Sequence, residues 1–191
     1  MMMKEIRLCE IRADNPAGTN GLIIRGVPII YDTSTVIADR QGDYTEIIRK
    51  GALDGADISD ARLMYNHDTN RLPLARTPKT MQLNRSAAGL EMIAELPDTE
   101  EAKAVHTAVK RGDLSGMSFA FKIPEGGDRW NKETRTREII KIEKVYEISI
   151  VPFPAYPQTS VEARSKIQEI YNNTRNEALI KCNQILFKGD L

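Results

Sequence analysis

Alternation of apolar and polar residues along the chain, with a period of two, restricts the fold of this sequence more than any other feature. Such alternation is typical of β-strands that have one buried face. Strand patterns, separated by turn-forming residues, occur in the ranges 4–31, 79–96, 116–123 and 137–151, and residues 61–67 form a short apolar strand pattern that ends in polar residues. Gly26 interrupts the first range and predicts a bulge or a sharp bend there. The body of the chain is therefore expected to be a small barrel or a strongly curved sheet.

One segment has a clear helical pattern instead, and it covers residues 99–111. Asp98 and Glu101 are spaced as a capping box, with Asp98 as the expected N-cap. Apolar residues follow at helical spacing, and Gly112 comes after two basic residues, which predicts the C-terminal end. The expected fold class is mainly β with helices (α+β), with this helix embedded among the strands.

The character of the chain changes near residue 160. Residues 161–191 are rich in charged and amide side chains and show only weak helical periodicity. This composition predicts a polar tail that is partly helical or disordered. We therefore expect one domain over residues 1–160 and a C-terminal tail over 161–191.

The charge balance excludes several classes of partner. Lysine and arginine together number 27 and so do aspartate and glutamate, which gives no indication of a nucleic-acid or membrane-surface partner. Cys9 and Cys182 lie near opposite ends and have neither zinc-site nor disulfide-framework spacing. We expect a soluble intracellular protein without metal or cofactor, since no signal peptide or transmembrane segment is recognisable.

The chain has two histidines, and they differ in context. His106 falls inside the expected helix, where a partly buried or surface histidine is ordinary. His67 stands where an apolar strand becomes polar, a position both rigid and exposed that suits a general base. A solvated loop histidine hydrogen-bonded to Asp68 explains the same pattern.

Two serines occur in the stretch SGMSFAFK, at positions 115 and 118. Because side chains alternate along a strand, Phe119 and Phe121 are expected to face the core. Ser118 then shares the opposite, open face with Ala120, where it is either an accessible nucleophile or a plain outward serine. Ser115 precedes the strand and is expected in a turn.

Glu147 lies in the strand pattern KVYEISIV, on the face opposite Tyr146, Ile148 and Ile150. It shares that face with Ser149, Val145 and Val151. A carboxylate there is costly unless it is exposed or has a partner. It could orient an imidazole, as the acid of a serine-nucleophile triad does, or it could blunt an exposed sheet edge. Serine, histidine and carboxylate are all present, but spacing alone does not bring them together.

Several stretches, in order, resemble the prohead proteases of tailed bacteriophages, which are distantly similar to herpesvirus assemblin. The resemblance covers roughly residues 20–164 and rests on order and spacing across many segments. The matching stretches are GVPIIYD, YTEIIRKGAL, MYNHD, LPLART, GLEMIAELPDTEEAKAVHTAVKRGDLSGMSFAF, REIIKIEKVYEISIVPFPAYPQT and EAR.

The resemblance implies a compact, assemblin-like β-barrel core and specific roles for site residues. His67 would be the general base and Ser118 the nucleophile, whereas Ser115 falls outside the family pattern. Assemblin uses a second histidine as third member, and Glu147 takes that place here by position. Arg76 matches the arginine of a Leu-Gly-Arg sequence that family members often have after the histidine.

The resemblance also implies a function. The chain would be a serine endopeptidase that processes the scaffold, or the scaffolding segment of the major capsid protein, in the immature phage head within the host cytoplasm. It would act as a dimer or higher homo-oligomer and lose its tail by self-cleavage. The alternative is a non-enzymatic scaffolding or head-assembly protein that keeps the fold.

Overall fold

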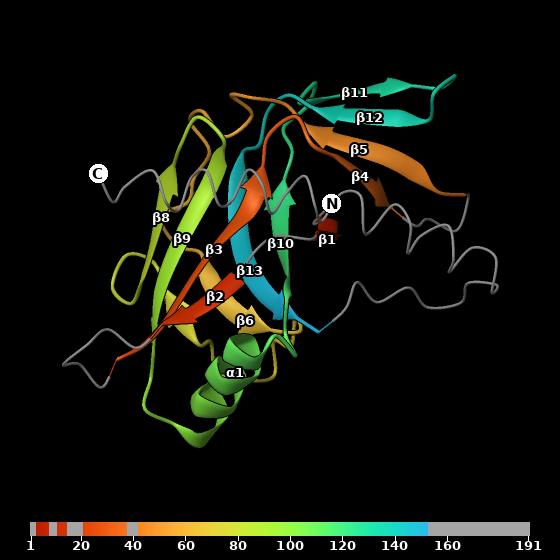
Figure 1. Ribbon diagram of the computed structural model, residues 1–191. Coiled ribbons are helices and arrows are strands. Elements are labelled where there is room, and N and C mark those ends of the chain that lie inside the picture. The colour runs from red at the N-terminus through yellow and green to blue at the C-terminus, as the bar shows by residue number, and fades with distance from the viewer. Residues whose placement is uncertain (1–2, 8–10, 15–20, 38–41, 153–191) are drawn as a thin grey trace, which may run out of the picture.

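The computed structural model describes residues 3–7, 11–14, 21–37 and 42–152 of the chain. The expected tail at 161–191, the proposed domain boundary near 160, and both cysteines lie outside these residues. Three sheets and one helix make up the described part (Figure 1). The expectation of a mainly β fold with an embedded helix is confirmed.

The largest sheet has five strands, and we call it the site sheet. Its order is β1 (Met3–Arg7), β10 (Gly116–Lys122), β13 (Lys144–Val151), β6 (Arg62–Tyr65) and β7 (Ala75–Arg76). The strand β13 pairs antiparallel with β10 on one side and parallel with β6 on the other. These three strands lie side by side through the middle of the molecule (Figure 1).

The other two sheets have four strands each. The second has the order β2 (Ile11–Asp14), β3 (Leu22–Ile30), β9 (Gly89–Leu96) and β8 (Met81–Arg85). The third has the order β11 (Asp128–Asn131), β12 (Thr136–Ile139), β5 (Tyr44–Ile48) and β4 (Ser34–Ile37). Within the described residues each sheet is open, so the expected barrel closure is not seen.

The hydrophobic core joins apolar residues of the site sheet and the second sheet. Ile24 of β3, Met92 of β9, Phe119 of β10 and Ile148 of β13 belong to one buried cluster. The rings of Phe119 and Phe121 lie 5.2 Å apart and are tilted against each other. Burial of both phenylalanines confirms that this face of β10 belongs to the core.

The second sheet contains the bulge that Gly26 predicts. The pairing of β3 with β9 shifts register between Gly26 and Ile29. Close by, Gly89 lies so near β3 that an added Cβ would be 1.9 Å from the Ile29 carbonyl oxygen. Only glycine allows this approach of the two backbones.

The helix α1 (Glu100–Arg111) is confirmed, but its expected N-cap is wrong. Thr99 caps the helix through its Oγ1, which accepts from the Ala102 N–H at 3.3 Å. Asp98 instead forms an ion pair with Lys103 at 2.7 Å. The C-terminal prediction holds, because Gly112 adopts the left-handed conformation with φ of 83°.

The strand expected over 137–151 is two strands that belong to different sheets. β12 pairs with β5 in the third sheet, and the chain then crosses to β13 in the site sheet. At the crossing, the Ile142 N–H donates to the Ala52 carbonyl at 2.7 Å. The segment between residues 123 and 137, where only turn-forming residues were expected, contains a further strand, β11, which pairs with β12. The third sheet extends away from the body, opposite α1 (Figure 1).

Candidate active site

His67 lies in a tight turn directly after β6. The Asp68 N–H donates to the Tyr65 carbonyl at 3.1 Å, which closes a four-residue turn. Both central residues have positive φ, 52° at Asn66 and 57° at His67, as in a type I′ turn. Asparagine tolerates this conformation well, whereas histidine does so at some cost, so surrounding contacts must hold the turn.

The central strand β13 supplies those contacts. The Asn66 N–H donates to the Ile150 carbonyl at 2.9 Å. The His67 N–H donates to the Ser149 hydroxyl oxygen at 3.2 Å. Both central N–H groups of the turn are therefore anchored on the strand that lies next to β6.

The imidazole of His67 contacts two functional side chains at once. Its Nε2 lies 2.7 Å from Ser118 Oγ, and its Nδ1 is hydrogen-bonded to Glu147 Oε1. Ser118 comes from β10 and Glu147 from β13, while the histidine follows β6, so adjacent strands provide all three. The structure thus brings together the three residues that the sequence singled out.

The register between β10 and β13 is unbroken as far as Glu147 and shifts just beyond it. Ser118 pairs with Ser149 and Ala120 with Glu147, but Phe121 pairs with Val145 because the register shifts after Ala120. The prediction that Val145 shares the face of Glu147 is therefore wrong, since Val145 joins the buried core cluster. The simple alternation missed the bulge.

The site is more enclosed than the sequence predicted. Ser118 is 0% exposed, so its placement on an open face is wrong. Ala120 and Ser149 on the same face are also fully buried, which shows that both faces of the site sheet are covered here. Glu147 is 7% exposed and lies on a central strand, which rules out an exposed edge charge.

The remaining candidates lie apart from this cluster. His106 is buried in α1, with Nε2 3.3 Å from the Asp14 carbonyl oxygen. Asp68 does not act as the partner of the His67 ring, because its carboxylate accepts from the Asn70 N–H at 3.0 Å and from Arg71 Nε at 3.2 Å. Ser115 precedes β10 and is outside the hydrogen-bonded trio.

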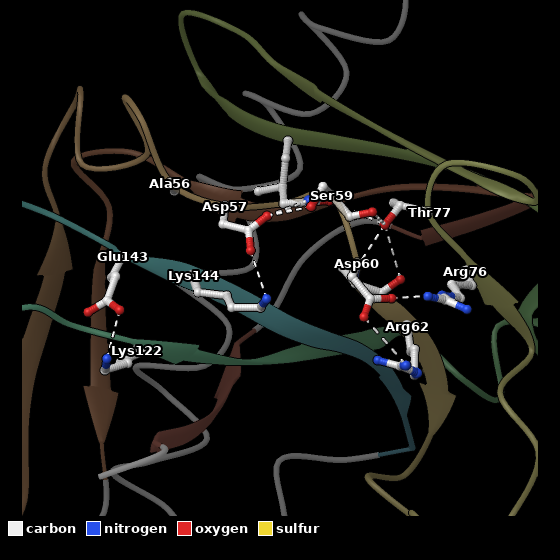
Figure 2. Close-up of polar contacts among 12 residues, drawn as sticks. Ala56, Asp57, Ser59, Asp60, Arg62, Arg76, Thr77, Lys122, Glu143 and Lys144 are labelled. Carbon is white, nitrogen blue, oxygen red and sulfur yellow. Dashed lines mark hydrogen bonds and ion pairs between the residues drawn. The ribbon is translucent and has the colours of Figure 1, made fainter.

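A second group of charged residues ties β6, β7 and β13 to the 57–62 segment (Figure 2). Asp60 accepts from Arg76 Nε at 2.7 Å and also pairs with Arg62 at 3.5 Å. The bond from Arg76 lowers the pKa of Asp60, and the bond from Lys144 to Asp57 at 2.7 Å lowers the pKa of Asp57. In this structure Arg76 links β7 to the segment that contains Asp60.

Two further observations describe the same part of the chain. No group of three or more histidine, cysteine, aspartate or glutamate side chains among the described residues could hold a metal ion. Within the same ranges, no helix has the length and apolar character needed to span a membrane.

A serine hydroxyl, an imidazole and a carboxylate in one hydrogen-bonded row is the arrangement found in serine hydrolases. Comparison with known families agrees with that class. Residues 8–173 match the family model described as caudovirus prohead serine protease, and the chain belongs to this family. Membership supports a role as a protease of capsid maturation.

Comparison with solved structures finds similarity to a phage protease. The capsid assembly protease gp21 of bacteriophage T4 is similar with a TM-score of 0.49 and 12% sequence identity. The similarity covers 80% of this chain and 98% of that chain. No curated protein sequence matches this chain.

Sequence reasoning missed the elements that hold His67 in place. Ser149 was placed on the face of Glu147 but was given no role. The left-handed turn had a signal, because an asparagine directly after a strand favours positive φ. The contact between the Ser149 hydroxyl and the His67 backbone had none, because it joins residues 82 positions apart.

Proposed function

We propose that this chain is a serine endopeptidase in which Ser118 is the nucleophile, His67 the general base and Glu147 the orienting acid. The observation that carries the proposal is the 2.7 Å contact between His67 Nε2 and Ser118 Oγ, with Nδ1 of the same ring bound to Glu147. A nucleophile within reach of a base, which a third group orients, is the arrangement that acyl transfer requires.

The contacts assign a role to each nitrogen of the imidazole. Nδ1–H donates to the Glu147 carboxylate, which leaves Nε2 unprotonated and able to accept the Ser118 proton. Ser118 Oγ then forms a bond to the peptide carbonyl carbon, and the imidazolium that results is stabilised by Glu147. This fixed tautomer is the contribution that geometry makes before substrate binds.

The remaining steps follow from the same proton. His67 Nε2–H protonates the leaving amine as the C–N bond breaks, and the acyl group stays on Ser118. A water molecule then gives a proton to Nε2 and attacks the ester carbonyl. Collapse of that intermediate returns the proton to Ser118 Oγ and releases the new carboxyl terminus.

Burial of the nucleophile places a condition on this mechanism. Ser118 has no exposed surface, so a peptide carbonyl reaches its Oγ only after neighbouring groups move aside. Movement of that kind restricts cleavage to substrates whose binding energy drives it. A restricted specificity suits a protease that acts among the proteins it helps to assemble.

The substrates we propose are the scaffold or the scaffolding segment of the major capsid protein, together with the chain's own tail at 161–191. The support is the family match, whose description places the protease in the prohead. The enzyme would act as a homo-oligomer inside the immature head in the bacterial cytoplasm.

Co-expression with the capsid and scaffold proteins of the same phage tests the proposal. Wild type should cleave these proteins and also remove its own tail, which lowers its intact mass. Ser118→Ala should do neither. Ser115→Ala is the matched control, because it removes a nearby hydroxyl outside the trio and should retain most processing.

Three results would refute the proposal. Equal loss in both serine variants would mean that the wrong nucleophile was chosen. Unchanged processing in Ser118→Ala would mean that Ser118 is not the nucleophile. The absence of any processing and any labelling by a fluorophosphonate at high protein concentration would favour the non-enzymatic head-assembly protein.

A further inference from the structure

The hydroxyl of Ser149 is the one side-chain group of β13 that binds the backbone of the proposed base. We propose that Ser149 is a positioning residue, which fixes His67 so that Nε2 faces Ser118 and Nδ1 faces Glu147. This inference rests on the proposed function and adds a residue to which neither the sequence nor the family match gives a role.

The conformation of His67 explains why its backbone needs an anchor. With φ of 57°, His67 is in a left-handed region that a histidine adopts only at some cost, and it follows a second left-handed residue. Closure of the turn uses the Tyr65 carbonyl and the Asp68 N–H, so the central N–H groups must find partners elsewhere. Ser149 Oγ accepts a hydrogen bond from the His67 N–H.

Burial makes this contact specific. Ser149 is 0% exposed, and a buried hydroxyl is unfavourable unless it is hydrogen-bonded. A strand position in an apolar sheet would more simply hold alanine or valine. The Ser149 hydroxyl instead binds the backbone of the turn that contains His67.

The register places Ser149 between the nucleophile and the base. It pairs directly with Ser118 on β10 and with Met64 on β6, three positions before His67. Strand β13 therefore fixes His67 at its ring through Glu147 and at its backbone through Ser149. Loss of the backbone anchor leaves the ring free to pivot about its remaining contacts.

Geometry gives the expected effect. A displacement of about 1 Å between reacting groups can reduce a rate about 100-fold. We expect Ser149→Ala to lower the second-order rate constant for fluorophosphonate labelling of Ser118 by about 10- to 100-fold. Ser149→Cys keeps the shape of the side chain, with a slightly larger and weaker acceptor atom, so its labelling rate should fall between those of wild type and the alanine variant.

A matched control separates positioning from a general loss of structure. Thr77 is another buried hydroxyl, 5% exposed, whose Oγ1 accepts from the Ala61 N–H at 2.8 Å. It lies in the charged group around Asp60 (Figure 2), and its hydroxyl contacts the 58–61 backbone and none of the three site residues. Thr77→Val should lower the melting temperature and leave the labelling rate within about twofold of wild type.

The experiment measures three quantities on the full chain: the labelling rate, the melting temperature, and hydrogen exchange of the His67 backbone amide by NMR. The proposal expects slower labelling and faster exchange at His67 in Ser149→Ala. Should the alanine variant not fold, Ser149→Cys must show the same direction of both changes.

Each outcome decides the proposal. Unchanged exchange at His67 in the Ser149 variants overturns it, and so does a fall in labelling no larger than that of Thr77→Val. If wild type is not labelled at Ser118, the proposed function fails. The exchange measurement still decides in that case whether Ser149 anchors His67.

Discussion

The carboxylate of Glu147 is a buried charge whose observed partner is the imidazole of His67. The two side chains are 9% and 13% exposed, so solvent screens their contact only slightly. Removal of either residue ends the contact, but the consequences differ. Loss of His67 leaves a charge behind, whereas replacement of Glu147 by glutamine removes the charge and keeps the shape.

This asymmetry predicts a difference in stability. His67→Ala should lower the free energy of unfolding by about 3–5 kcal/mol at pH 7, the usual cost of stranding one partner of a buried pair. At about 2–4 °C per kcal/mol for a chain of this size, the melting temperature should fall by about 6–20 °C. Glu147→Gln should change stability by no more than about 1 kcal/mol, because its amide oxygen can still accept from Nδ1–H.

The double variant isolates the charge. When Glu147→Gln is added to His67→Ala, no stranded carboxylate remains, so at least half of the lost stability should return. All variants are measured in a Ser118→Ala background, which prevents self-cleavage from changing the length of the chain. Urea unfolding at pH 7 gives the free energies, and calorimetry gives the melting temperatures.

His106→Ala is the matched control. This histidine is 4% exposed, but it faces a backbone carbonyl and no carboxylate. Its removal should cost the same with and without Glu147→Gln. The reasoning is refuted if His67→Ala is no more destabilising than Glu147→Gln, or if the second substitution restores nothing.

Two other predictions concern the stability of the fold. Gly89→Ala should destabilise the fold by more than about 3 kcal/mol, because the added Cβ would lie 1.9 Å from the Ile29 carbonyl oxygen. Gly126→Ala is the control, since Gly126 has open space around it, and it should cost about 1–2 kcal/mol. Urea unfolding measures both values. The bond from Lys144 holds the pKa of Asp57 below its usual range, so its stabilising effect is present above about pH 4 and is lost as the pH falls through the folded-state pKa. Asp57→Asn should therefore have a lower free energy of unfolding than wild type at pH 7. If this difference between the two proteins stays constant down to pH 3, the prediction is contradicted.

Local patterns in the sequence predicted the elements whose causes are local. The helix at 100–111 follows from apolar spacing and a terminal glycine, and the β3 bulge follows from Gly26. The cap was wrong by one residue because Asp98 and Thr99 are both good N-caps and Lys103 attracts the carboxylate of Asp98. Choices of this kind depend on side chains that the helix itself brings near.

Patterns failed where a strand changes its sheet or its register. The alternation of residues 137–151 continues across the crossing from β12 to β13, so periodicity gives no sign that two sheets are involved. It also assumes unbroken pairing, and the register shift after Ala120 moves Val145 to the core. Ser118 shares its face with other buried residues, a fact that depends on what covers the sheet and not on the strand itself.

The candidate site depends on pairings between strands that are distant in the sequence. The sequence could therefore indicate which residues form the site, but it could not predict their arrangement in space. His67 is 51 positions from Ser118 and 80 positions from Glu147, and only the order β10–β13–β6 brings them together. The family resemblance supplied the identity of the three residues, since relatives preserve order along the chain. What it did not supply was the support around His67. Because β13 is the middle strand, it alone can reach the base through the ring and through the backbone, so a shift of one residue in its register would turn Glu147 and Ser149 away from the imidazole together.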